Sequence, residues 1–185
     1  MDPKQLIREA QLLFVEGKIR ESIESFTKAL EAGADPFMVY LSLGVAHMKL
    51  KEVDRAIDDF NKAIDVNSKN ARAYYYRGMV FLAKDEFEKA VSDFSIALEL
   101  KPDLHTAKFA RATAYARMEK FVEAAIDLRA VLPQLEANVQ SFVDTYGIMR
   151  TEMWKVIAQI TERPTPSLEL TEKEIDIIKK WLVEE

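Results

Sequence analysis

The chain has 185 residues, of which 49% are apolar and 31% are charged, and its formal net charge is −5. This composition is typical of a folded soluble protein and lacks the basic excess that a general nucleic-acid-binding protein needs. The absence of cysteine excludes disulfides, thiolate metal sites and thiol catalysis. Only 5 glycines and 6 prolines are present, which indicates a nearly all-helical chain.

The first residues, MDPKQLIREAQ, contain no long apolar segment, so we expect no signal peptide. No apolar run approaches the length of about 18 residues that a membrane-spanning helix needs. We therefore expect a cytoplasmic protein with no membrane span.

From residue 3 onward the sequence repeats with a period of 34 residues, and four rows align without a gap. One column holds only very small residues: Ala10, Gly44, Gly78 and Ala112. A second column of small residues holds Ser22, Ala56, Ala90 and Ala124. A third column is large and apolar and holds Phe26, Phe60, Phe94 and Leu128. The small columns allow helices to cross closely, and the large column fills the space beside them.

Each row contains two apolar stripes at helical spacing with a short polar break between them, which predicts a helix–turn–helix. The breaks are residues 16–18, 50–52, 84–86 and 118–120. One helical hairpin cannot bury both of its stripes, so the rows are predicted to stack into an all-α solenoid. The predicted repeats are residues 3–36, 37–70, 71–104 and 105–138.

After the repeats the pattern changes. Residues 139–162 carry one long amphipathic stripe and are predicted to form a helix that caps the fourth repeat. Residues 163–170 contain two prolines and are predicted to be a linker. Residues 171–185 are predicted to form an amphipathic helix, which docks either on its own protein or on a partner. Its docking face would consist of Ile175, Ile178, Trp181 and Leu182.

The third row resembles the tetratricopeptide repeat, a family with this 34-residue period. The residues that carry the resemblance are Tyr74, Gly78, Phe81, Ala90, Phe94, Ala97 and Pro102. The resemblance extends over about residues 3–138. It implies a right-handed superhelical solenoid with C-terminal capping helices, in which the first helix of each repeat lines a concave groove. It implies little about function, because the family binds proteins of many kinds.

The family pattern assigns different roles to the three consecutive tyrosines of the third row. Tyr74 is expected in the packing between repeats, and Tyr75 and Tyr76 on the groove side. The predicted groove lining consists of Ile7, Leu41, Val45, Tyr75, Tyr76, Met79 and Phe109, with Arg72 and Arg117 towards its C-terminal end. An apolar strip of this kind indicates an interaction surface, and tyrosine and arginine are frequent interface anchors.

Some members of the family grip a C-terminal carboxylate through Lys and Asn side chains on successive first helices. The matching positions here are Ile7, Gln11, Ser42, Arg72 and Tyr76. Only Arg72 is basic, so this sequence does not favour such a carboxylate clamp.

We therefore interpret the chain as a non-catalytic protein–protein interaction module or adaptor that binds an apolar helix or peptide, with a preference for some acidic residues. The alternative is a structural self-assembly scaffold, in which the helix at 171–185 docks in the groove of its own or another copy. The groove could thus be filled by a partner, by this segment or by a second copy.

The sequence contains no signature of an enzyme or of a cofactor site. There is no Gly-rich phosphate loop, no G-x-S-x-G and no H-E-x-x-H. His47 and His105 do not have metal-ligand spacing, and we expect His47 to be packed or half-exposed. We expect no catalysis, no cofactor and no metal. Asp58, Asp59 and Asp93 fall on second helices and are expected to be solvated on the outer face.

Overall fold

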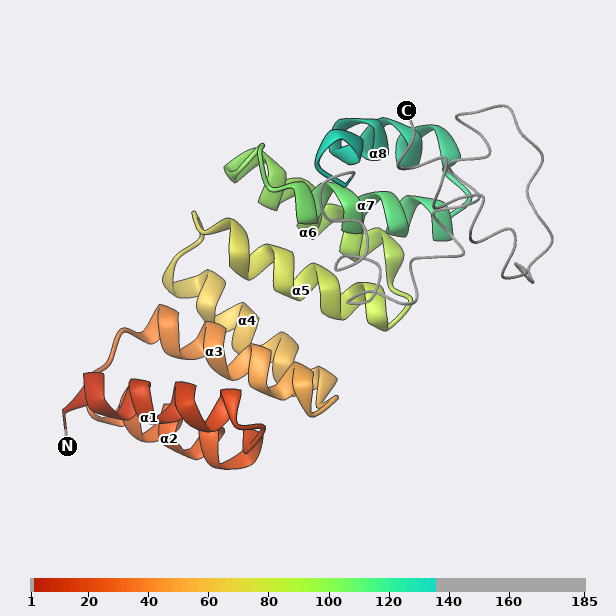
Figure 1. Cartoon of the computed structure of the whole chain (residues 1–185). Helices are drawn as coiled ribbons and strands as arrows, with labels where there is room; N and C mark the ends of the chain where they lie inside the picture. The colour runs from red at the N-terminus through yellow and green to blue at the C-terminus, as the bar shows by residue number, and fades with distance from the viewer. Residues whose placement is uncertain (1, 136–185) are drawn as a thin grey trace. The chain divides into compact units, whose positions relative to one another are not determined.

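The computed structural model describes residues 2–135, and all regular secondary structure among them is helical (Figure 1). The all-α fold predicted from the sequence is confirmed for this part of the chain. The helices are α1 (Pro3–Val15), α2 (Ile19–Glu31), α3 (Pro36–Lys49), α4 (Val53–Val66), α5 (Ala71–Ala83), α6 (Phe87–Leu100), α7 (His105–Arg117) and α8 (Phe121–Leu135). The predictions for residues 139–162, 163–170 and 171–185 lie outside the described residues.

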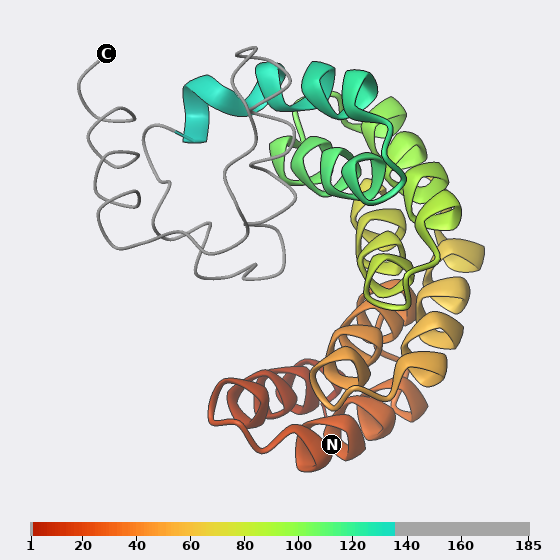
Figure 2. The ribbon, with the colours of Figure 1, turned by 90° about the vertical axis from the view of Figure 1, so that its right-hand side faces the viewer.

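The helices belong to two compact units, Met1–Asp103 with α1 to α6 and Leu104–Glu185 with α7 and α8. In the first unit, consecutive helices pair as hairpins, α1 with α2, α3 with α4 and α5 with α6. The hairpins stack through contacts of α2 with α3, α4 with α5 and α3 with α5. Within this unit, α1, α3 and α5 form one layer and α2, α4 and α6 the other (Figure 2). In the second unit, α7 packs against α8.

Close crossings of small and aromatic residues hold each hairpin together. Phe60 and Phe94 are completely buried, as are Ala56 and Ala90 one turn before them. A Cβ atom built on Gly44 would lie 2.5 Å from Cε1 of Phe60. The small column of the sequence therefore exists because the ring of the second helix contacts the backbone of the first.

Three of the first helices begin at a side-chain cap. Asp2, Asp35 and Asn70 accept hydrogen bonds from the backbone N–H groups of Lys4, Phe37 and Arg72, respectively. Such caps satisfy N–H groups that have no partner inside the helix. Proline follows the cap in α1 and α3, where its missing N–H has no consequence. These signals fix the entry point of each of the three hairpins in the first unit.

The turns inside the hairpins share one unusual backbone conformation. Gly17, Lys51, Asp85 and Glu119 all have positive φ, at 79°, 60°, 58° and 59°. The residue after each of them donates a hydrogen bond back to the preceding helix, for example from Lys18 N to Leu13 O at 2.9 Å and from Glu52 N to His47 O at 2.9 Å. This is the Schellman ending of a helix, which favours glycine at the left-handed position. Only the first hairpin has glycine there.

Exchanging residues at this position tests the cost of the left-handed conformation. Gly17→Ala is expected to lower the free energy of unfolding by about 1 kcal/mol, because an L-residue is disfavoured at positive φ. An added Cβ on Gly17 would meet no atom within 4 Å, so no steric clash contributes. The reverse change, Lys51→Gly, is expected to stabilise the protein by up to about 1 kcal/mol. Urea unfolding measures the free energy of unfolding of both variants. Destabilisation by Lys51→Gly would contradict a cost of the left-handed conformation at this position.

Buried ion pairs inside the hairpins correct one of the sequence predictions. Asp59 and Asp93 were expected to be solvated, but only 6% and 3% of their surfaces are exposed. Arg77 donates two hydrogen bonds to Asp93, from Nε to Oδ2 at 2.8 Å and from Nη2 to Oδ1 at 2.7 Å. In the second unit, Arg111 holds the buried Asp127 in the same bidentate way, at 2.7 and 2.8 Å. A buried carboxylate must be paired, and these arginines on the first helices supply the charge.

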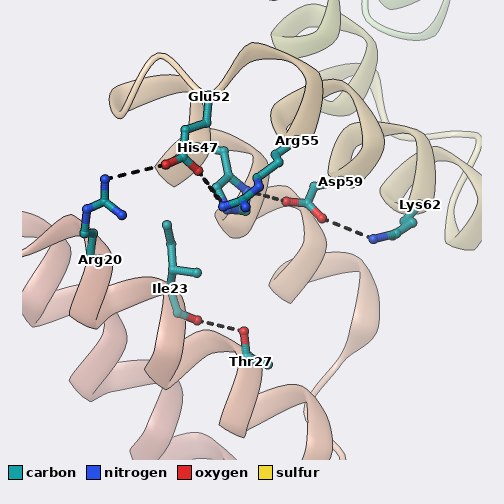
Figure 3. Close-up of polar contacts among 8 residues, drawn as sticks. All are labelled: Arg20, Ile23, Thr27, His47, Glu52, Arg55, Asp59 and Lys62. Carbon is teal, nitrogen blue, oxygen red and sulfur yellow. Dashed lines mark hydrogen bonds and ion pairs between the residues drawn. The ribbon is translucent and has the colours of Figure 1, made fainter.

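In the α3–α4 hairpin, a histidine pairs with the buried aspartate in place of an arginine (Figure 3). Leu43 stands at the position of Arg77 in the repeat, and His47 supplies the partner one turn later. Its Nδ1 lies 2.7 Å from Oδ2 of Asp59, so the ring donates to the carboxylate. Nε2 of His47 lies 3.8 Å from Glu52, which also pairs with Arg55 at 3.0 Å. His47 is thus packed, as the sequence predicted, with 9% of its surface exposed.

Candidate functional site

The first unit contains a pocket of about 490 Å³ on the layer of first helices. Side chains of α1, α3 and α5 enclose it, and Phe26 of α2 contributes as well. The lining residues are Gln11, Phe14, Val15, Phe26, Met38, Leu41, Ser42, Val45, Arg72 and Tyr76. The volume is within the range of pockets that bind small molecules or side chains.

The pocket lining is apolar apart from Gln11, Ser42 and Arg72. The hydroxyl of Ser42 already donates to the carbonyl oxygen of Met38 at 2.8 Å. Arg72 is exposed in the first turn of α5, and its guanidinium forms no ion pair among the described residues. No acidic residue lines the pocket. The pocket therefore combines an apolar surface with one available positive charge.

Four of the nine residues predicted to form the groove line this pocket: Leu41, Val45, Arg72 and Tyr76. Leu41 is buried, so it forms the floor of the pocket and offers little surface of its own. Ile7 is half-buried against the core between α1, α2 and α3, and Met79 is half-buried on α5. Phe109 and Arg117 lie on α7 in the second unit, where Phe109 is buried and Arg117 half-buried.

The structure changes the expected role of one of the three consecutive tyrosines, Tyr75. Tyr75 is only 8% exposed and packs against Phe94, with 6.1 Å between the ring centroids, so it is a core residue and not an exposed anchor. Tyr74 is half-buried, with the guanidinium of Arg77 5.7 Å from its ring centroid. Tyr76 stacks on Phe60, with ring centroids 5.9 Å apart, and lines the pocket. Only Tyr76 is available to a ligand in the way the sequence suggested.

The sequence prediction missed several pocket residues at the ends of α1 and α3. Val15 is 83% exposed and Met38 is 43% exposed, although both are apolar. Phe14 and Val15 directly follow the predicted groove face of α1, and Met38 precedes Leu41 and Val45 at helical spacing. Extending the groove face by one turn in each direction would have found them.

Two other kinds of site are not seen in the described part of the chain. Among residues 2–135, no three His, Asp or Glu side chains come together in an arrangement that could hold a metal ion. None of the helices in the same residues combines the length and the apolar character that crossing a bilayer requires.

Comparison with known proteins identifies the fold. The family model of the tetratricopeptide repeat matches residues 38–70, which cover the α3–α4 hairpin except for the first two residues of α3, and residues 71–104, which contain the α5–α6 hairpin. These two segments are tetratricopeptide repeats, and the resemblance predicted from the sequence is confirmed for them. No curated protein sequence matches the chain significantly.

Solved structures of other proteins are similar to this chain over most of its described length. A crystal structure of MamA is 26% identical and covers 75% of this chain and 81% of its own, with a TM-score of 0.66. The first tetratricopeptide-repeat domain of Spaghetti (RPAP3), bound to the HSP90 peptide SRMEEVD, is 27% identical and covers 64% and 94%, with a TM-score of 0.60. The first such domain of human RPAP3 is 25% identical and covers 64% and 93%, also with a TM-score of 0.60.

Proposed function

We propose that the protein is a non-catalytic interaction module that binds an apolar segment of another protein in the pocket between α1, α3 and α5. The observation that carries the proposal is the exposed apolar rim of the pocket. Val15 and Met38 leave much of their surface to solvent beside Tyr76 and the buried floor. Removing apolar surface of this kind from water favours association. In a concave site, a single ligand segment can cover most of that surface.

Arg72 gives the proposed ligand a second feature. It is the only charged residue of the lining, and it is exposed at the start of α5. A carboxylate on the ligand would form a charge-assisted hydrogen bond with its guanidinium. No acidic residue lines the pocket, so a positively charged ligand group would find no carboxylate there with which to form an ion pair. The ligand is therefore an apolar peptide segment with an acidic residue next to its apolar side chains.

The comparison with RPAP3 supports peptide binding by a fold of this type. That domain was solved with an HSP90 peptide of sequence SRMEEVD, which contains acidic residues. The carboxylate clamp that the sequence analysis considered would need further basic residues, whereas Gln11, Ser42 and Tyr76 occupy matching positions here. We accordingly propose recognition through an apolar anchor and one side-chain carboxylate.

Selection of peptides from a random displayed library on the full-length chain tests this function. The selected peptides are expected to contain clustered apolar residues and at least one Asp or Glu. Fluorescence anisotropy with the selected peptides is expected to show binding weakened about tenfold or more by Val15→Asp, because a charge would then face the apolar ligand. Arg72→Glu is expected to weaken the same peptides through charge repulsion.

Matched controls are available in the same unit. Val66→Asp also places an aspartate at the last residue of a helix, at a half-exposed valine outside the pocket. It is expected to leave peptide affinity unchanged. Equal affinities of the Val15→Asp and Val66→Asp variants, or selection of peptides rich in lysine, would overturn the proposal.

A further inference from the structure

We infer that Met38 is a site of reversible oxidation, and that its oxidation by a peroxide lowers the affinity of the pocket for its ligand. The inference rests on the proposed function, since it concerns the regulation of the same pocket. Oxidation converts the apolar thioether of methionine into a polar sulfoxide. At Met38 this change would place a polar group on the apolar rim of the pocket.

The reaction is a two-electron oxidation that transfers one oxygen atom. A lone pair of the Met38 sulfur attacks one oxygen of hydrogen peroxide, so that an S–O bond forms while the O–O bond breaks. After proton transfer the products are the sulfoxide and one molecule of water. A methionine sulfoxide reductase reverses the step, and its dithiol is oxidised to a disulfide while the oxygen leaves as water. The chain contains no cysteine, so none of its own groups can consume the peroxide as a thiolate.

Exposure distinguishes Met38 from the other methionines of the described residues. These residues contain Met38, Met48, Met79 and Met118. Met38 is 43% exposed, whereas the other three are half-buried, and Met48 packs against the core between α3, α4 and α5. A peroxide has to reach the sulfur atom, so the rate of oxidation follows exposure. Met38 is therefore expected to react before the other three.

The repeats show that the fold accepts a polar group at the position of Met38. Lys4 and Arg72 occupy the same position in the preceding and the following repeat, and both are exposed in the first turn of a first helix. The backbone carbonyl of Met38 accepts a hydrogen bond from Ser42, and oxidation of the side chain does not alter that carbonyl. A sulfoxide at Met38 is therefore expected to leave the helices intact.

The same polar group would act against binding of an apolar ligand. Met38 stands one turn before Leu41 and two turns before Val45, and all three line the pocket. The thioether of Met38 offers apolar surface that adapts to the shape of a ligand. An apolar ligand side chain that covers a sulfoxide removes water from its oxygen and supplies no hydrogen-bond donor in return. Oxidation therefore lowers the affinity for apolar segments.

Peptide mapping by mass spectrometry after brief exposure of the full chain to hydrogen peroxide tests the reactivity. In the folded protein, Met38 is expected to be oxidised severalfold faster than Met48, Met79 and Met118. In urea the four rates are expected to become similar, because unfolding exposes every sulfur atom. A saturating amount of a selected peptide is expected to slow the oxidation of Met38 severalfold, because the ligand covers it. Equal rates for the four methionines in the folded protein would overturn the inference.

Fluorescence anisotropy with the selected peptides tests the effect on binding, after catalase has removed the peroxide. Complete conversion of Met38 to the sulfoxide is expected to weaken binding about tenfold, and treatment with the reductase is expected to restore it. Met38→Leu keeps the apolar surface and is expected to bind normally and to lose no affinity after peroxide. Met38→Gln is expected to bind as weakly as the oxidised protein without any peroxide. Met48→Leu is the matched control and is expected to remain sensitive to peroxide.

The outcomes separate this inference from the proposed function. If the untreated protein binds the peptides and full conversion of Met38 leaves their affinity unchanged, the inference fails and the proposed function stands. A loss of affinity that persists in the Met38→Leu variant would also overturn the inference, because another methionine would then cause it. The same holds if oxidation of Met38 abolishes the helical circular dichroism, since the loss of binding would then come from unfolding. If the untreated protein binds no peptide, the proposed function itself fails and the inference fails with it.

Discussion

Replacing Arg77 by leucine is expected to lower the free energy of unfolding by about 3–5 kcal/mol, because it leaves the buried carboxylate of Asp93 without its partner. The side chain of Asp93 is 5% exposed, so water cannot replace the two hydrogen bonds that Arg77 donates. The hydrogen bonds to Asp93 also raise the pKa of Arg77 above its ordinary value. Guanidinium chloride unfolding measures the loss.

The neighbouring repeat suggests a compensating change. In the α3–α4 hairpin, Leu43 stands where Arg77 does, and His47 supplies the hydrogen bond to the aspartate. Phe81 occupies the position of His47 in the α5–α6 hairpin. Adding Phe81→His to Arg77→Leu is therefore expected to recover part of the lost stability. If the single change Arg77→Leu costs less than about 1 kcal/mol, the pair does not have the role assigned to it.

Replacing Phe60 by alanine is expected to cost about 3–5 kcal/mol, because the completely buried ring would leave a cavity between α3 and α4. The ring touches Gly44, so Gly44→Ala alone is expected to destabilise as well, by about 1–3 kcal/mol, through overpacking. In the Phe60→Ala background the clash disappears. Gly44→Ala should then become neutral or stabilise by up to about 1 kcal/mol, because alanine is the better helix former.

Thermal and denaturant unfolding of the two single variants and the double variant gives the free energies of unfolding for a double-mutant cycle. Strict additivity of the two changes would contradict direct contact between the Phe60 ring and the Gly44 backbone. A matched pair, Gly78 and Phe94, exists in the next hairpin, where the added Cβ would lie 2.8 Å from Cε1 of Phe94. The same sign reversal is expected there.

The helices and the fold type of residues 2–135 could be predicted from the sequence. The 34-residue period locates each hairpin, and the polar breaks coincide with the four turns that contain Gly17, Lys51, Asp85 and Glu119. The spacing of apolar residues and the preferences of turn residues are local, so they can be read from a single sequence. The columns of small residues also predicted where two helices cross.

The ion pairs could not be predicted by considering each residue separately. Asp93 is 16 residues from Arg77 in the sequence. Considered by itself, an aspartate on a helix is expected to be exposed to solvent. The spacing recurs between Arg111 and Asp127, so the repeat held a signal, but His47 replaces the arginine one turn later in the α3–α4 hairpin. Which basic side chain reaches the carboxylate depends on how two helices pack.

The sequence by itself determined the helical hairpins, their turns and the residues at each crossing, because these follow from local spacing that repeats along the chain. Only the tertiary structure decided that Tyr75 is a core residue while Tyr76 faces the pocket. It also brought Val15, Val45 and Arg72 together from three helices. A pocket of this kind depends on the relative rotation and offset of stacked helices, which the packing of side chains across several repeats sets.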